Sequence, residues 1–160
     1  MPETKEMLDL LAKEGLTLGC VESLTAGLFA ATVCDVPGAS AVFAGGLVTY
    51  DPRLKVKLAD VSQKSIDLAG VVSAEVASQM AIGGAKTLGV DVCVSCTGNA
   101  GPTVQKGGEP VGKVFLGLYY NGYTWSLPLQ LDGDRRKIRE QTVENMVEFV
   151  ISLFTVHKDS

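Results

Sequence analysis

The chain has 160 residues and a mass of 16.8 kDa, and 46% of its residues are hydrophobic and 20% are charged. A chain of this size and composition is expected to fold as one globular domain, spanning 1–160, without a disulfide or metal to staple it. Its 18 acidic residues exceed its 14 basic ones, so the net charge is −4. This excess of negative charge argues against a nucleic-acid partner, because a protein that binds nucleic acid needs a broad basic surface.

The N-terminus lacks the basic and apolar regions of a secretory signal, and no stretch of sequence reaches the ~18 apolar residues needed to span a bilayer. Four cysteines, Cys20, Cys34, Cys93 and Cys96, lie in apolar segments, a distribution typical of buried, reduced thiols. We therefore expect a cytoplasmic protein with no membrane partner.

The first half of the chain predicts alternating helices and strands. Apolar residues at helical spacing end at Gly15, small apolar residues follow Ser23, and Asp51-Pro52 places a proline in the first turn of a helix. The predicted elements are a helix over 4–14, a strand over 16–21, a buried helix over 24–33, a strand over 41–50, a helix from 52, and helices over 62–69 and 74–88.

The second half of the chain predicts the rest of a sheet and a final helix. A β-branched run over 90–95 is typical of a central strand, and Asn121-Gly122 favours a type I′ hairpin turn. The remaining predicted elements are a mobile flap over 103–109, strands over 111–120 and 123–131, and a last helix that follows Asp134 and runs to about Phe154. The fold class is therefore α/β, a three-layer α/β/α sandwich whose mixed sheet ends in an antiparallel hairpin.

The chemistry open to the chain is narrowed by what the sequence lacks. The single histidine, His157, lies near the C-terminus, which leaves no credible Ser-His-Asp triad or histidine-rich zinc site. Cys93 and Cys96 have metal-like spacing, but on a strand they point to opposite faces. The sequence contains no phosphate-loop or dinucleotide fingerprint. We expect no metal and no cofactor.

A hydroxyl nucleophile with a lysine base remains possible. Ser23 and Thr25 follow a buried strand and precede a helix, where free N–H groups and the positive helix end could stabilise an oxyanion. Lys55 lies among apolar residues, where desolvation would lower its pKa from ~10.4 towards neutrality. The alternative is that Ser23 only caps the helix and Lys55 lies on a solvated face.

Five blocks in order resemble the CinA C-terminal domain family, whose stand-alone members are nicotinamide-nucleotide amidases. The blocks are Glu22-Ser23-x-Thr25-x-Gly27, Val48-x-Tyr50-x4-Lys55, Ser95-x-Thr97-Gly98-x-Ala100-Gly101-Pro102, Pro110-Val-Gly112 and Gly133-Asp-Arg135-x-x-Ile138-Arg139. The resemblance implies an α/β/α fold and hydrolysis of nicotinamide mononucleotide, a small pyridine nucleotide, to nicotinate mononucleotide and ammonia.

The resemblance also implies roles for individual residues. Ser23 would be the nucleophile of a Ser-Lys dyad, Lys55 its general base and Tyr50 a neighbour that polarises or positions them, with Thr25 in reserve as nucleophile. The residues expected to bind substrate are Glu22, Thr25, Gly27, Thr97, Gly98, Ala100, Gly101, Arg135 and Arg139.

Alternatives stay open for several of these residues. The loop from Thr97 to Gly101 would hold the ribose phosphate or the ring, or it is an ordinary glycine-rich turn. Arg135 and Arg139, four residues apart, would face a phosphate together, or they form surface ion pairs. Glu22 either orients Lys55 or is a buried acid satisfied by backbone N–H groups.

Two departures from the family pattern lie at the expected ligand rim. Asn99 replaces an aliphatic residue, and the segment Thr103–Glu109 differs from the usual glycine- and acid-containing one. A catalytically degenerate nucleotide-binding or competence-associated interaction module is therefore a second hypothesis, and an amidase for another carboxamide is a third. We also expect a homo-oligomer, with Leu127 and Leu129 of the hairpin facing a partner subunit.

Overall fold

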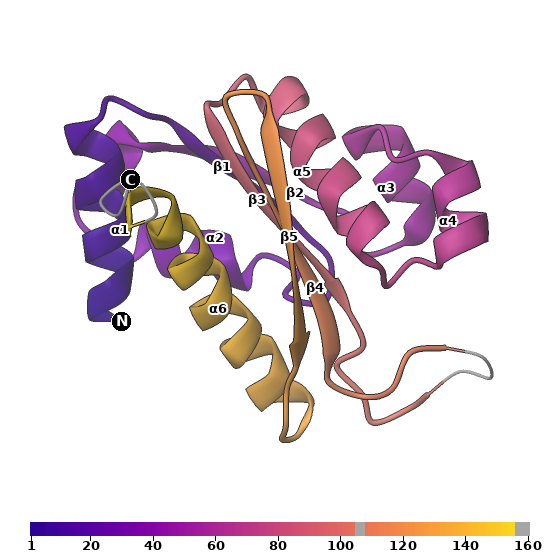
Figure 1. Ribbon diagram of the computed structural model, residues 1–160. Coiled ribbons are helices and arrows are strands. Elements are labelled where there is room, and N and C mark those ends of the chain that lie inside the picture. Colours follow the sequence, from indigo (N-terminus) through magenta and orange to yellow (C-terminus); the bar gives the residue numbers. More distant parts are fainter. Residues whose placement is uncertain (105–107, 156–160) are drawn as a thin grey trace.

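The computed structural model describes residues 1–104 and 108–155. Helices and strands alternate over residues 2–48, three helices follow, and three strands and a long helix complete the fold (Figure 1). The elements are α1 (Pro2–Lys13), β1 (Leu18–Glu22), α2 (Leu28–Cys34), the short 3-10 helix η1 (Ala39–Ala41), β2 (Phe43–Val48), α3 (Pro52–Ala59), α4 (Gln63–Ala69), α5 (Ala74–Leu88), β3 (Val92–Gly98), β4 (Lys113–Tyr120), β5 (Tyr123–Gln130) and α6 (Arg135–Thr155).

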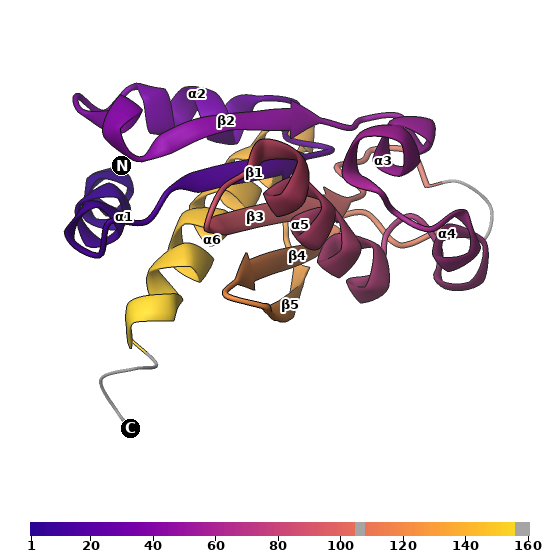
Figure 2. The same ribbon diagram turned by 90° about the horizontal axis from the view of Figure 1, so that it is seen from above.

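The strands form one mixed sheet in the order β2-β1-β3-β4-β5 (Figure 2). β1 pairs in parallel with β2 and β3, whereas β4 pairs antiparallel with both β3 and β5. Helix α5, with α3 and α4 beside it, covers one face, and α1, α2 and α6 lie on the other (Figure 1). The predicted three-layer sandwich with a closing antiparallel hairpin is confirmed.

The core lies on both faces of the two central strands, and every residue of β1 is buried. Cys93 contacts the apolar cluster under α5, whereas Cys96 belongs to the cluster under α6, which confirms that the two thiols point to opposite faces. Cys34 is exposed, so the expectation of buried thiols is wrong at that position, at the end of a short surface helix. Leu127 and Leu129 are partly buried and pack against the α6-side cluster.

Local sequence signals explain several element boundaries. The Asp51 carboxylate accepts a hydrogen bond from the Arg53 amide at 2.8 Å and begins α3, with Pro52 at its first position. Ser73 caps α5 in the same way. Asn121 and Gly122 both have positive φ, of 51° and 83°, as the predicted type I′ turn requires.

The helix predicted over 24–33 begins only at Leu28. Ala26 and Gly27 adopt left-handed φ values of 48° and 99°, so the chain turns between Ser23 and Gly27 before α2 starts. Two other expectations lie partly or wholly outside the described residues. They are the flap over 103–109, of which 105–107 are not described, and the position of His157.

Within residues 1–104 and 108–155, no helix combines the length and apolar character needed to cross a membrane.

Close contact between α5 and α3 gives a test of the packing that positions α3. A Cβ added at Gly83 would lie 1.6 Å from the Ala59 carbonyl oxygen. We expect Gly83→Ala to lower the free energy of unfolding by about 2–3 kcal/mol, as overpacking does, measured by urea denaturation. Alanine is the better helix former by up to about 1 kcal/mol, so a stabilised variant would contradict this contact. Ile82→Ala, at a neighbouring half-exposed position, is the matched control and should have a much smaller effect.

Candidate active site

A polar cavity of about 210 Å³ lies where β1 and β3 end, at the edge of the sheet where open α/β folds bind ligands. It is lined by Ser23, Leu24, Tyr50, Lys55, Val71, Val72, Thr97, Gly98, Asn99, Ala100 and Arg135. Segments far apart in sequence therefore bring a hydroxyl, an amine, a phenol and a guanidinium to one small space.

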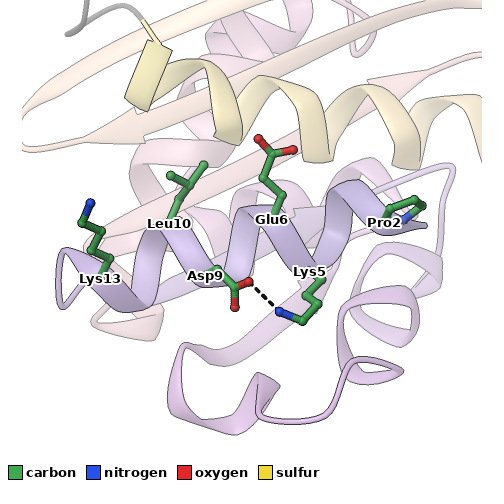
Figure 3. A pocket seen from close by; sticks show the side chains of 6 residues that line it. All are labelled: Pro2, Lys5, Glu6, Asp9, Leu10 and Lys13. Atoms are coloured by element: carbon green, nitrogen blue, oxygen red, sulfur yellow. Dashed lines mark hydrogen bonds and ion pairs between the residues drawn. The ribbon is translucent and has the colours of Figure 1, made fainter.

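A second depression of the surface has fewer polar groups that converge on one space. This depression, of about 400 Å³ on α1, is lined by that helix alone, and its side chains splay outwards (Figure 3). Its Lys5–Asp9 ion pair, at 2.7 Å, joins two exposed side chains of the kind that contribute little to stability. Convergent polar groups from several elements are found in the cavity at Ser23 instead.

Ser23 and Lys55 are in direct contact. The Lys55 Nζ lies 2.9 Å from the Ser23 Oγ and 2.6 Å from the Thr49 carbonyl oxygen, to which it donates. The Thr49 amide in turn donates to the Glu22 carbonyl oxygen at 2.8 Å, which ties the chain after β2 to the end of β1. The backbone thus fixes the amine opposite the hydroxyl.

Lys55 is wholly buried, with 0% of its surface exposed, so the alternative of a solvated lysine is excluded. Burial lowers the pKa of its amine from 10.5 to about 8, although the Asp51 carboxylate partly opposes this shift. At neutral pH roughly one amine in ten is then uncharged, against fewer than about one in a thousand for a solvated lysine. Ser23 therefore faces an amine that can accept its proton.

The carboxylate of Glu22 binds the start of α2. It is buried and accepts hydrogen bonds from the amides of Phe29 at 2.9 Å and Ala30 at 3.2 Å. Of the two alternatives for Glu22, the structure shows the buried acid satisfied by backbone N–H groups. The expectation that this helix end is open to an oxyanion is wrong, because the Glu22 carboxylate occupies it.

Tyr50 lines the cavity together with Arg135. The Arg135 guanidinium donates to the Tyr50 hydroxyl at 2.9 Å and to the Gly101 carbonyl oxygen at 2.6 Å. Tyr50 is 55% exposed, and its hydrogen bond goes to Arg135 rather than to the dyad. The phenol therefore positions a cation at the mouth of the cavity.

Arg139 points elsewhere, and the two arginines do not share one pocket. Its Nε donates to the Leu24 carbonyl oxygen at 2.8 Å and its Nη2 to the Thr25 carbonyl oxygen at 3.1 Å. Thr25 is wholly buried, with its hydroxyl 3.2 Å from the Cys96 Sγ, whereas the Lys55 amine contacts the Ser23 hydroxyl. Among the expected binding residues, Glu22, Thr25, Gly27, Gly101 and Arg139 lie outside the described lining.

The loop after β3 supplies one wall of the cavity. The Thr97 hydroxyl donates to the Val71 carbonyl oxygen at 2.9 Å and so ties this wall to the segment before α5. Val71 and Val72, which line the cavity, were missed by sequence reasoning because two valines in a connecting segment carry no motif.

Asn99 organises the outer rim. Its amide donates to the carbonyl oxygens of Thr103 at 3.3 Å and Glu109 at 3.1 Å, and its Oδ1 accepts from the Gly101 amide at 2.9 Å. A second cavity of about 330 Å³ adjoins here and shares four lining residues with the first, Val71, Val72, Gly98 and Asn99. The departure noted at position 99 is thus a clamp between two loop segments.

In the part of the chain that the structure describes, no three His, Cys, Asp or Glu side chains gather as metal ligands would.

The model of the CinA C-terminal domain matches residues 2–154. The chain belongs to this family. It is 44% identical over 144 residues to a CinA-like protein of Kosmotoga olearia and 38% identical over 140 residues to a putative competence-damage inducible protein of Alkaliphilus metalliredigens. The matches cover 90% and 88% of this chain but 35% and 34% of those relatives, so the chain spans about a third of their length.

Solved structures agree with the assignment to the CinA family. The competence/damage inducible protein CihA from Agrobacterium tumefaciens is 31% identical, with a TM-score of 0.91 over 95% of this chain and 93% of that one. A CinA superfamily protein from Escherichia coli is 27% identical, with a TM-score of 0.91 over 94% and 88%. The α/β fold is therefore the fold of this superfamily.

Desolvation of Lys55 predicts a specific pH dependence of stability. Its pKa of about 8 in the folded chain lies below the ~10.4 of an unfolded one, so between these values the unfolded chain binds more protons. The free energy of unfolding should therefore rise with pH across this window, by up to about 3 kcal/mol, relative to Lys55→Met. Chemical denaturation of both proteins from pH 7 to 10.5 measures this difference, in which other titrating groups cancel. A constant difference would show that the amine is solvated.

Proposed function

We propose that this CinA-family domain is an amidohydrolase that converts nicotinamide mononucleotide to nicotinate mononucleotide and ammonia through a Ser23–Lys55 dyad. The observation that carries the proposal is the 2.9 Å contact between the Ser23 hydroxyl and the buried Lys55 amine, whose pKa burial lowers to about 8. An activated hydroxyl beside an uncharged base is the requirement for nucleophilic attack on a carbonyl.

The proposed reaction runs in two halves. The Ser23 oxygen attacks the carboxamide carbon while its proton passes to the Lys55 Nζ. The C–N bond then breaks, the amine returns the proton to the departing nitrogen, and ammonia leaves an ester on Ser23. Water, deprotonated by the same amine, attacks that ester, and the C–O bond breaks to release the carboxylic acid and restore the hydroxyl.

The charged groups of the cavity suit these reaction steps. With Glu22 occupying the start of α2, the described cationic groups of the lining are Arg135 and, once it has taken the proton, Lys55. A protonated Lys55 next to the reacting oxygen favours the negative tetrahedral intermediate. Lys55 therefore serves as the base in the first step and as the neighbouring positive charge afterwards.

The lining also suits a pyridine nucleotide. Leu24, Val71 and Val72 offer apolar surface to a flat ring, and the exposed side of the Arg135 guanidinium offers a partner for a phosphate. The first cavity is small, and the adjoining cavity beyond Asn99 gives room for the remainder of a nucleotide. Tyr50, Thr97, Gly98 and Ala100 complete our proposed binding site. We also propose that this salvage step takes place in the cytoplasm and that the protein is a homo-oligomer.

A second candidate function rests on the rim. Asn99 ties Thr103 to Glu109 beside the cavity, and the named relatives are described only as CinA-like or competence-damage inducible. A domain that binds a nucleotide but does not hydrolyse it would have such a cavity, with a rim that does not support the reaction. Calorimetry on nicotinamide mononucleotide separates the two candidates, since binding without ammonia release favours the second.

Ammonia release from nicotinamide mononucleotide tests the dyad. We expect Ser23→Ala and Lys55→Met each to reduce the rate by at least about 10³-fold, because each removes one partner of the proton transfer. A coupled ammonia assay at pH 8 measures the loss. Ser62→Ala, an exposed helix cap on α4, is the matched control and should retain wild-type turnover. Undiminished release by Ser23→Ala would remove Ser23 as the nucleophile, and a panel of other carboxamides would reveal a different substrate.

The same amine should set the pH profile of the reaction. The base acts in its uncharged form, so below the Lys55 pKa of about 8 the value of kcat/KM should fall about tenfold per pH unit. Above that pH it should reach a plateau. Steady-state rates from pH 6 to 10 measure the profile, and an inflection near pH 6 or below would point to a different base.

A further inference from the structure

The turn that carries Ser23 is held in a conformation that its own sequence does not favour. Ala26 has a φ of 48° and Gly27 a φ of 99°, so two successive residues are left-handed, and only the glycine adopts this region without steric cost. A non-glycine residue in this region persists where surrounding contacts determine it. Those contacts are therefore the source of the position of Ser23.

The end of the turn is fixed by Glu22, whose carboxylate holds the Phe29 and Ala30 amides. The buried side of the turn is fixed by Thr25, whose hydroxyl lies 3.2 Å from the Cys96 Sγ. Both residues are wholly buried. Burial raises the pKa of the Cys96 thiol to about 11, and hydrogen bonds from Thr25 and from the Ser23 backbone act in the opposite direction. Cys96 is thus an uncharged thiol that contacts the buried side of the turn.

The outer side of the turn is fixed by Arg139. Its guanidinium bridges two successive carbonyl oxygens, those of Leu24 at 2.8 Å and Thr25 at 3.1 Å, directly after Ser23. A planar fork that binds two acceptors restricts the orientation of both peptide groups more than one bond does. Arg139 is half-buried and lies outside the described lining of the cavity, whereas Arg135, one helical turn earlier, lies within it.

We propose that Arg139 is a positioning residue that holds the strained turn with Ser23 against Lys55, and that Arg135 alone of this arginine pair contacts the substrate. The inference rests on the proposed function, because it takes Ser23 as the nucleophile. It replaces the expectation that both arginines face a phosphate. Lysine at position 139 keeps the charge but has one donor atom, so it cannot span both carbonyl oxygens.

Two readouts separate positioning from binding. The first is kcat and KM for ammonia release. The second is the rate at which a small, uncharged sulfonyl fluoride modifies Ser23, where the serine oxygen displaces fluoride and no phosphate is involved. Arg139→Lys should lower both kcat and the sulfonylation rate at least tenfold and change KM less than twofold. Arg135→Lys, the matched variant, should raise KM at least tenfold and leave sulfonylation within twofold of wild type.

A rescue experiment tests the same point with a second variant. Methylguanidinium added to Arg139→Ala should restore a measurable part of the sulfonylation rate, while methylammonium should not, because only the planar fork bridges two carbonyl oxygens. If Arg139→Ala does not fold, the Arg139→Lys measurements decide the question. All rates are compared below the melting temperature of each variant.

The outcomes that overturn the proposal are specific. Arg139→Lys that sulfonylates at the wild-type rate, or that raises KM as Arg135→Lys does, would show that Arg139 does not position Ser23. If the wild type releases no ammonia, the amidase proposal fails, yet the sulfonylation rates still report on the turn.

Discussion

The arrangement of the whole site depends on keeping one lysine amine out of water beside a serine. Lys55 is wholly buried, and its amine lies 2.9 Å from the Ser23 Oγ. Removing this amine from water costs free energy, which the rest of the fold offsets. Its position follows from backbone contacts. Asp51 begins α3, so that Lys55 lies one turn into the helix, and Thr49 joins the chain after β2 to the end of β1. Ser23 directly follows β1 and Lys55 lies within α3, so regular elements position both residues.

Around Ser23, polar groups that could serve catalysis serve structure instead. The start of α2 would be a ready-made site for a negative charge, but the Glu22 carboxylate fills it. Arg139 could bind an anion, but its donors bind the carbonyl oxygens of the turn. Positive charge inside the cavity is consequently concentrated on Lys55 and Arg135, which places one cation beside Ser23 and one at the mouth.

Sequence reasoning predicted the fold closely because its signals are local. The helix start at Asp51-Pro52 and the turn at Asn121-Gly122 each determine the backbone within a few residues, and both predictions are confirmed. The start of α2 was misplaced because the left-handed Ala26 is imposed by long-range contacts, and nothing in an alanine indicates them. For the same reason Arg135 and Arg139, equivalent in sequence, proved to have different partners, since the direction of each guanidinium depends on elements more than 30 residues away.

The rim of the cavity depends on different contacts from those that position Ser23 and Lys55. Relatives that are 31% and 27% identical share the fold at a TM-score of 0.91, so the fold that places Ser23 and Lys55 tolerates extensive substitution. Asn99, by contrast, acts through side-chain bonds to the loop carbonyl oxygens of Thr103 and Glu109, and it lines both adjoining cavities. A change of this one amide would reshape the space for the non-reacting part of a ligand without disturbing the helix or strands that hold the dyad. In the proposed amidase, selectivity would therefore change at the loop while the proposed chemistry at Ser23 is retained, because the two depend on different contacts.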